Sequence, residues 1–385
     1  MLPEIYLDNA ATTQTDPDVA EVALRMMQMD YGNPSSLHKK GLQAQLQLDK
    51  ARAQVARLLD CLPEEVVFTS GGTEANNLAL LGGAEALRRR GNHIVTTAYE
   101  HASVLEAAAQ LEKLGFSVTY VPPGADGTID PAAIAAAVTA QTILVSCMLV
   151  NSETGALIPI EKVASLVRRK NKNCLIHGDA VQAFGKIPLS SKKAGVDLLT
   201  VSAHKIHAPK GCGALFVRKG VHLRPLLFGG GQEKSLRPGT ENTALIAAFG
   251  HAADNARTHM AESYAAVQDI CKFFVNKCEG MPELCINSPA NTTPYVMNIS
   301  IPGYRSETLI HHLAAAGIYV SGGSACAKGA KSHVLTAMGL TTARIESSLR
   351  ISFSRYSTTD EVARFFAVLQ DGLDTLVHTI RPGRA

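Results

Sequence analysis

Short runs of apolar residues alternate with longer amphipathic segments along most of the chain. Seven runs between residues 66 and 217 are rich in valine, isoleucine and leucine, which is typical of buried strands. The segments between them, such as 74–90 and 103–114, carry apolar residues at helical spacing. The seven runs are 66–69, 93–97, 117–121, 143–146, 174–177, 198–201 and 214–217. Strands buried on both faces and separated by helices predict an α/β layer with a mostly parallel seven-stranded sheet.

The pattern changes after residue 250. A long helical pattern over 252–280 leads to a strand-like run at 296–301, a helical segment at 306–316 and a second strand-like run at 349–353. This order predicts a smaller α+β domain that begins near residue 255.

Composition sets limits on the function. The chain has 385 residues, of which 46% are hydrophobic and 18% charged, as in ordinary soluble globular proteins. The net charge of +3 is too small to indicate nucleic-acid binding. The sequence opens with no signal-peptide pattern and has no apolar run of about 18 residues, so we expect a cytoplasmic protein.

The eight cysteines lack paired short spacings, which indicates a reduced intracellular set and not a disulfide framework. Cys271, Cys278 and Cys285 recur every seven residues, but Gly280 and Pro282 interrupt the helix that would align them. Three lone thiols also fit a zinc site poorly, so filling of the core is the better interpretation.

A lysine at the end of a strand is the most informative chemical feature. Lys205 follows the apolar run 197–201, within the sequence Ser-Ala-His-Lys-Ile-His. An amine condenses with a carbonyl only when it is unprotonated, and burial near other cations lowers the pKa of a lysine. This position suits a lysine that forms a Schiff base, although most lysines after a strand are solvated loop residues.

Polar residues at other strand ends suit an aromatic, phosphorylated cofactor. Segment 68–77 turns through glycines into a helix start, which favours an anion, although Ser70 or Thr73 as a plain N-cap explains it equally well. Asp179 follows an apolar strand and suits a protonated ring nitrogen such as that of pyridoxal phosphate, or again an N-cap. His101 suits acid-base catalysis or ring stacking, although a lone histidine is more often structural.

Two further residues are candidates for substrate chemistry. Cys326 lies in a glycine-rich stretch followed by Lys328 and Lys331, where a thiolate is favoured; the alternative is an inert cysteine in a turn. Arg350 lies on a predicted strand and suits a substrate carboxylate, although on its own a solvated strand arginine is the simpler interpretation.

Together these residues resemble the NifS/IscS-like cysteine desulfurases, which belong to the class V aminotransferase branch of fold-type I pyridoxal phosphate enzymes. The resemblance covers nearly the whole chain. The matching blocks are 7–13, 32–36, 69–77, 100–101, 150–155, 179–182, 202–210, 237–242, 323–326 and 350–355. It implies a large cofactor-binding domain of residues 15–255 and a small domain of residues 1–14 and 256–385, which carries the catalytic cysteine.

The resemblance also implies a role for each matching residue. Lys205 forms the Schiff base with pyridoxal 5'-phosphate and then moves the Cα proton, while Cys326 takes the sulfur of L-cysteine as a persulfide and releases L-alanine. His101 stacks on the cofactor ring and exchanges protons. The remaining cofactor contacts are Asp179 at the ring nitrogen, Gln182 at the ring oxygen, Gly72, Thr73, Ser202 and His204 around the phosphate, Asn151, and Thr240 from the neighbouring subunit of a homodimer. Asn151 and Arg350 bind the substrate carboxylate.

The sulfur acceptor is a separate question. The segment from Cys326 to Val334 is shorter and richer in lysine than in relatives that supply an iron-sulfur scaffold, and the C-terminus, at Arg384-Ala385, comes earlier than in those relatives. These departures favour a tRNA-thiolating enzyme as the acceptor. Other class V enzymes, such as a selenocysteine lyase or an aminotransferase, remain alternatives, as does a non-catalytic sulfur-carrier or assembly protein.

Overall fold

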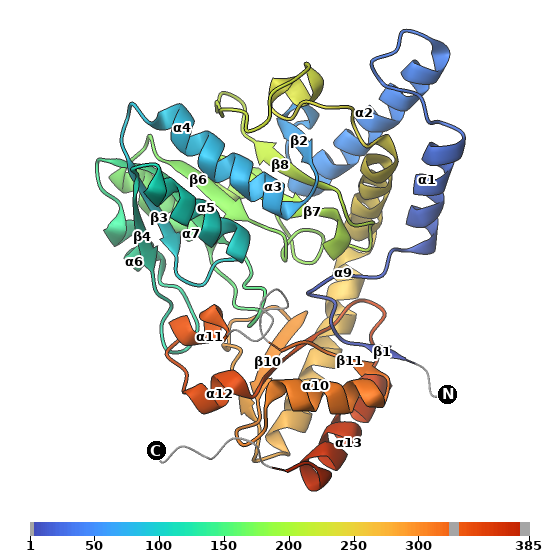
Figure 1. The fold of residues 1–385 in the computed structure, drawn as a ribbon, viewed down its shortest axis with the longest axis vertical. Helices are drawn as coiled ribbons and strands as arrows, with labels where there is room; N and C mark the ends of the chain where they lie inside the picture. Colours follow the sequence, from blue (N-terminus) through green and yellow to red (C-terminus); the bar gives the residue numbers. More distant parts are fainter. Residues whose placement is uncertain (1–3, 323–330, 378–385) are drawn as a thin grey trace.

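The computed structural model describes residues 4–322 and 331–377 (Figure 1). The larger sheet has seven strands in the spatial order β2-β8-β7-β6-β5-β3-β4. Neighbouring strands are parallel except at β8, which runs antiparallel to both β2 and β7. The strands are β2 (Val66–Thr69), β3 (His93–Thr97), β4 (Ser117–Val121), β5 (Thr142–Met148), β6 (Leu175–Asp179), β7 (Leu198–Ser202) and β8 (Gly213–Val217). The expected α/β layer with a mostly parallel sheet is confirmed.

Both faces of this sheet are buried, because adjacent strand residues alternate between two apolar clusters. Val67, Leu144 and Leu198 pack on one face with residues of α3, α4 and α5, whereas Val145 and Leu199 pack on the other with residues of α2, α6, α7 and α9. The helices of this layer are α1 (Pro17–Gln28), α2 (Lys39–Leu59), α3 (Gly72–Asn77), α4 (Gly83–Leu87), α5 (Ala102–Lys113), α6 (Pro131–Ala137), α7 (Ile160–Lys170) and α8 (Ser191–Ala194). The expected helix over 74–90 is divided, because a π-helical segment, Leu78–Gly82, separates α3 from α4.

A second, smaller unit lies below the first in Figure 1. Its antiparallel sheet has the order β12-β10-β9, and β1 pairs in parallel with β11 beside it. These strands are β1 (Ile5–Tyr6), β9 (Cys285–Ile286), β10 (Val296–Ser300), β11 (Ile318–Tyr319) and β12 (Ser348–Ser352). The helices are α10 (Ser306–Ala315), α11 (His333–Ala337), α12 (Thr342–Glu346) and α13 (Thr359–Thr375). This is the smaller α+β unit that the sequence predicts.

The long helix α9 (Thr243–Glu279) connects the two units (Figure 1). Its first half, including Phe249, packs in the core of the large sheet, and its second half, including Phe274, packs in the core of the small unit. Ile5 and Leu7 also belong to the small core. This division supports the proposed boundary near residue 255 and the proposed placement of the N-terminal segment, with the boundary inside a continuous helix.

The regularly spaced cysteines have structural positions. Cys271 and Cys278 lie on α9 inside the small core, and burial raises the pKa of these thiols to about 11 and about 12. Cys285 follows the end of α9 and lies in β9. Among residues 4–322 and 331–377, no helix has the length and apolar character needed to cross a membrane.

Candidate active site

A cavity of about 310 Å³ lies where strands of the large sheet end and helices begin. In open α/β sheets the carboxyl ends of parallel strands commonly form the ligand site. Many of the predicted site residues line this cavity: Gly72, Thr73, His101, Asp179, Gln182, Ser202, His204, Lys205 and Arg350. The structure therefore brings together residues that lie far apart in the sequence, from Gly72 to Arg350.

Lys205 reaches the cavity from the end of β7. It closes the short 3₁₀ helix Ala203–Lys205, and its Nζ donates hydrogen bonds to the carbonyl oxygens of Ala10 at 2.6 Å and Ala11 at 2.7 Å. His207, two residues later, adopts a left-handed backbone with φ of 65°, a conformation that costs a non-glycine residue of the order of 1 kcal/mol or more. Its N–H donates to Thr13 Oγ1 at 2.8 Å, so the N-terminal segment holds both residues in place.

Asp179 ends β6 and belongs to a buried polar chain. Its Oδ1 accepts from the N–H of Val181 at 2.9 Å, and its Oδ2 accepts from Asn76 Nδ2 at 2.8 Å. Asn76 also donates to Ser103 Oγ at 2.8 Å, and Ser103 Oγ lies 2.8 Å from His101 Nδ1. The aspartate caps its own turn and is held facing the cavity at the same time, so its two expected roles are compatible.

His101 is the N-cap of α5. Its Nδ1 accepts from the N–H of Ser103 at 3.2 Å, so in the neutral ring the proton lies on Nε2. Burial lowers the pKa of His101; the Asp179 carboxylate opposes this effect, while Lys205 and His333 add to it. A neutral imidazole with an N–H donor at Nε2 is therefore the state that the surroundings favour near neutral pH.

Small and polar residues form another part of the cavity wall. A Cβ added to Gly72 would lie only 2.9 Å from Val181 Cγ2, so a larger residue here would force Val181 or the start of α3 to shift. Ser202 Oγ is buried and has no hydrogen-bond partner among the described residues. Burial, followed by the charge of Lys205, lowers the pKa of His204 to about 4, so its ring is neutral at physiological pH.

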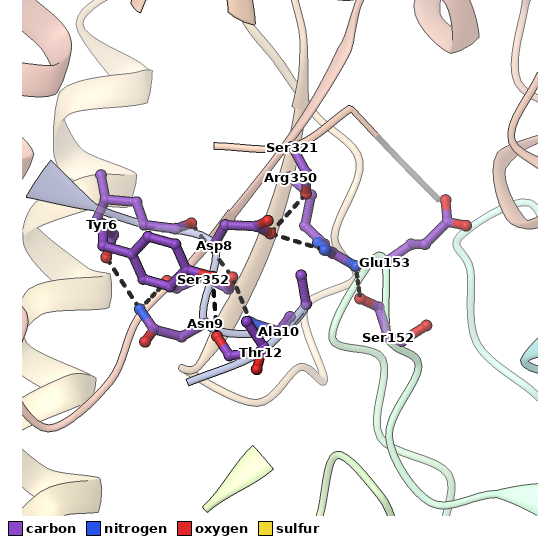
Figure 2. Close-up of polar contacts among 12 residues, drawn as sticks. Tyr6, Asp8, Asn9, Ala10, Thr12, Ser152, Glu153, Ser321, Arg350 and Ser352 are labelled. Carbon is purple, nitrogen blue, oxygen red and sulfur yellow. Dashed lines mark hydrogen bonds and ion pairs between the residues drawn. The ribbon is translucent and has the colours of Figure 1, made fainter. Parts of the chain in front are cut away.

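Arg350, on β12, brings the small unit to the cavity. Figure 2 shows its contacts with Asp8 and Ser152. Its Nη2 lies 2.9 Å from Asp8 Oδ1, and its Nη1 donates to the carbonyl oxygen of Ser152 at 3.1 Å. Asp8 Oδ1 also accepts from Ser321 Oγ at 2.9 Å. Arg350 is only 3% exposed, and its Nε has no partner within the part of the chain that the structure describes. These contacts hold the planar guanidinium in one orientation, which suits the binding of a carboxylate.

Two described residues of the predicted site, Asn151 and Thr240, do not line the cavity. Asn151 is fully buried in the loop after β5, where its Nδ2 donates to the carbonyl oxygen of Tyr99 at 3.1 Å and its Oδ1 accepts from the N–H groups of Glu153 and Thr154, both at 2.9 Å. Thr240 is exposed on the segment before α9. Cys326 lies outside the described residues. The roles of all three stay predictions.

Other residues near the site were missed at the sequence level. Asn76 and Asp8 lie within the matching blocks, but only the folded chain reveals that they contact Asp179 and Arg350. Glu153 and His333 line the cavity, and Glu153 Oε2 accepts from Ser332 Oγ at 2.5 Å. No local pattern distinguishes these residues from solvated ones, because their partners are distant in the sequence.

Comparisons with known proteins agree with this architecture. The model of the family "Aminotransferase class-V" matches residues 5–365. "Cysteine desulfurase 2" of Trichormus variabilis is 42% identical over 95% of this chain and 92% of its own length, and "Cysteine desulfurase IscS" of Dictyoglomus turgidum is 38% identical over 99% and 97%.

Solved structures give the same result. A structure titled "NIFS-LIKE PROTEIN" has a TM-score of 0.92 at 38% identity, covering 97% of this chain and all of the other. A structure titled "SspA in complex with cysteine" has a TM-score of 0.82 at 33% identity, covering 92% of this chain and all of the other. The fold is that of the fold-type I pyridoxal phosphate enzymes. The chain belongs to the class-V aminotransferase family.

Proposed function

We propose that this chain is a cysteine desulfurase, which uses pyridoxal 5'-phosphate to remove sulfur from L-cysteine and releases L-alanine. One observation carries the proposal: a single cavity is lined by Lys205, Asp179, His101 and Arg350, a set that suits an aldehyde cofactor and an amino-acid substrate. The near full-length identity to proteins named cysteine desulfurases supports the choice of substrate.

The described residues fit the cofactor. The cavity volume lies within the range of small-molecule sites, roughly 300–1,000 Å³. Asp179 offers a buried carboxylate to a ring N–H, and the unpartnered hydroxyl of Ser202 offers a donor to a phosphate oxygen. When bound, pyridoxal phosphate supplies an electron-withdrawing ring that stabilises negative charge at the Cα of an amino acid.

The residues of the chain would provide positions and protons. Asp179 would keep a proton on the ring nitrogen, because a buried carboxylate stabilises a neighbouring cation. Arg350 would hold the substrate carboxylate by two parallel hydrogen bonds. The amine of Lys205 would take the proton from Cα once the substrate amine has displaced it from the cofactor. His101, neutral and with N–H at Nε2, would donate within the cavity.

Cys326 is the proposed sulfur acceptor within the enzyme. None of the seven cysteines among the described residues lines the cavity. Burial raises the pKa of six of these thiols, to about 11 for Cys271 and about 12 for Cys61, Cys174, Cys212 and Cys278, and raises that of Cys147 as well, which makes them poor nucleophiles. The described residues on either side of Cys326 support its role, since Ser321 contacts Asp8 and Ser332 contacts Glu153, which lines the cavity. Lys328 and Lys331 would favour its thiolate form.

The test is to incubate the cofactor-loaded enzyme with L-cysteine and a reductant, and to quantify alanine and sulfide. We expect equal amounts of the two products, with no product from the Lys205→Ala variant. Pyruvate with ammonia, or a 2-oxo acid with loss of the visible cofactor band, would instead identify a lyase or an aminotransferase. Turnover of selenocysteine but not of cysteine would identify a selenocysteine lyase.

A homodimer is part of the proposal, with Thr240 of one subunit contacting the phosphate in the other. Several large apolar side chains are exposed on α1, on α2 and in the segment before η4 (Gln232–Ser235), a feature that commonly marks an interaction surface. They are Leu24, Met27, Leu42, Leu46, Leu227 and Phe228. Sedimentation analysis should give twice the monomer mass, and Thr240→Ala should weaken cofactor retention. A monomer that retains the cofactor fully would contradict this.

We also propose that the enzyme acts in the cytoplasm and passes sulfur to a tRNA-thiolating enzyme. Supply of an iron-sulfur scaffold is the alternative. The two proposals are separated by mixing the persulfide-loaded enzyme with each purified acceptor in turn and measuring the sulfur transferred. Efficient transfer to the scaffold alone would reject the thiolation proposal.

A further inference from the structure

Lys186 is a buried lysine to which the proposed chemistry gives no task. It is 6% exposed and lies in the irregular segment between β6 and α8. Its Nζ donates to Gln182 Oε1 at 3.0 Å and lies 5.7 Å from the centre of the Tyr295 ring. Within residues 4–322 and 331–377, no carboxylate forms an ion pair with it. Burial of a lysine without a carboxylate partner lowers the stability of the folded protein. A function for the contact between Lys186 and Gln182 would explain why it is kept.

The surroundings of Lys186 are cationic. Burial lowers its pKa to about 7, and the charges of Lys205 and Arg350 contribute in the same direction. Lys186 in turn contributes to the lowered pKa of His204 and of His207. An anionic oxygen close to these groups would be stabilised.

Two contacts, with Lys186 and with the carbonyl oxygen of Ala10, determine which end of the Gln182 amide faces each partner. The amine of Lys186 donates to the amide oxygen, and the carbonyl oxygen of Ala10 can only accept, so it faces the amide nitrogen. The Nε2 of Gln182 then donates to the carbonyl oxygen of Ala10 at 2.8 Å, the same oxygen that accepts from Lys205. Nε2 carries two protons, and its second N–H remains for a ligand in the cavity that Gln182 lines.

We propose that Lys186 is a positioning residue that holds Gln182 with its N–H toward the cavity, so that Gln182 donates a hydrogen bond to the anionic ring oxygen of the bound cofactor. This role depends on one part of the proposed function, namely that pyridoxal phosphate binds in the cavity. The two flipped orientations of the Gln182 amide have nearly the same shape, so its hydrogen-bond partners decide between them. Without Lys186 one of these partners is lost, and Oε1 has no donor. A flipped amide would present an acceptor to a negative oxygen.

The proposal predicts a change in the spectrum of the bound cofactor. A donor at the ring oxygen stabilises its anionic form, so removal of that donor raises the pH at which the visible absorption band titrates. We expect Lys186→Met to raise this apparent pKa by about 1 unit, which corresponds to a tenfold change in the protonation equilibrium. Gln182→Leu should produce a rise of similar size.

A double-mutant cycle shows whether Lys186 acts through Gln182. In the Gln182→Leu background, Lys186→Met should cause no further rise in the apparent pKa. A full additional rise would mean that the charge of Lys186 acts on its own, and would overturn the positioning role. Lys193→Met, the same change at an exposed position, is the matched control and should leave the apparent pKa unchanged.

A second variant covers the case in which Lys186→Met does not fold. Gln182→Glu keeps an acceptor for Lys186 but has no N–H to offer the cavity, so it should also raise the apparent pKa. An unchanged value in Gln182→Glu would overturn the proposal. The titration requires only bound cofactor, so a wild-type enzyme that shows the spectrum but forms no alanine would contradict the proposed function and leave this inference testable.

Discussion

Arg350 and Asp8 lie 342 residues apart in the sequence, yet Nη2 of Arg350 is 2.9 Å from Oδ1 of Asp8 (Figure 2). Asp8 follows β1 and Arg350 lies on β12, so the pair joins the two ends of the chain beside the cavity. The backbone N–H of Arg350 also donates to the carbonyl oxygen of Ser321 at 2.6 Å. The arginine is therefore oriented by contacts from three separate parts of the sequence.

The first prediction concerns recognition of the substrate carboxylate. Arg350→Gln should raise the KM for L-cysteine roughly 10- to 100-fold, because a hydrogen bond to a charged group contributes about 1.5–3 kcal/mol. Binding of cysteamine, which has the amine and thiol of cysteine but no carboxylate, should be unchanged. Spectral titration of the loaded enzyme with both compounds measures this. Equal losses for the two ligands would indicate a general structural defect.

The second prediction concerns stability. Arg350→Gln leaves the partly buried carboxylate of Asp8 without its cation, so we expect a lower melting temperature. Adding Asp8→Asn removes the uncompensated charge and should restore part of the loss. Differential scanning calorimetry of the single and double variants of the cofactor-free protein tests this, and strictly additive losses would show that the two residues are energetically independent.

The third prediction concerns the support of Asp179. Asn76→Ala removes the donor to Asp179 Oδ2 and breaks the chain that continues to Ser103, so cofactor affinity should fall about tenfold if one hydrogen bond to a charged group is lost. Asn77→Ala, at the next position of α3, is the control, because Asn77 is only partly buried and its side chain donates to the backbone oxygen of Thr73 and not to Asp179. Retention of the visible band during dialysis provides the measurement. Similar retention in both variants would argue against a role for Asn76.

The fourth prediction is a dependence of stability on pH. His177 is fully buried between Ser146 and Thr200, and burial lowers its pKa to about 4. The unfolded histidine titrates near about 6.5, so between roughly pH 6.5 and 4 the unfolded state binds the extra proton and stability falls as the pH decreases. The contribution is at most about 1.4 kcal/mol per pH unit.

The His177→Gln variant separates this effect from other titrations. Gln can retain hydrogen bonds to Ser146 and Thr200 but does not titrate, so its stability should depend less steeply on pH in this window. Urea unfolding of the cofactor-free protein at several pH values gives both slopes. Identical slopes for the wild type and the variant would show that His177 takes up no proton on unfolding, and would contradict the prediction.

Local patterns predicted much of the fold and part of the site. The runs at 66–69, 93–97 and 117–121 coincide with β2, β3 and β4, because apolar runs bounded by turn residues are a local signal of buried strands. The same signal points to Lys205 and Asp179, since each lies within four residues of the end of such a run. The π-helical segment at Leu78–Gly82 has no comparable signal in the sequence.

Contacts between distant residues could not be predicted in this way. The sequence predicts that Asn151 contacts the cofactor and the substrate, and only the structure reveals that its amide group also bonds to the backbone of its own loop and of Tyr99. Lys186 has an ordinary sequence setting, and only the packing of Tyr295 and Gln182 around it reveals that it is buried. Such roles depend on which elements meet in space, and hydrophobic periodicity does not encode this.

The most direct test of the proposed function is the state of Cys326 after a single turnover. The loaded enzyme is mixed with one equivalent of L-cysteine, blocked with an alkylating reagent and analysed by peptide mass spectrometry. We predict that the peptide containing Cys326 gains the mass of one sulfur atom while one equivalent of alanine appears, and that Cys326→Ala keeps its cofactor but forms neither product. Unchanged alanine formation by Cys326→Ala, or the added sulfur on another cysteine, would contradict the account.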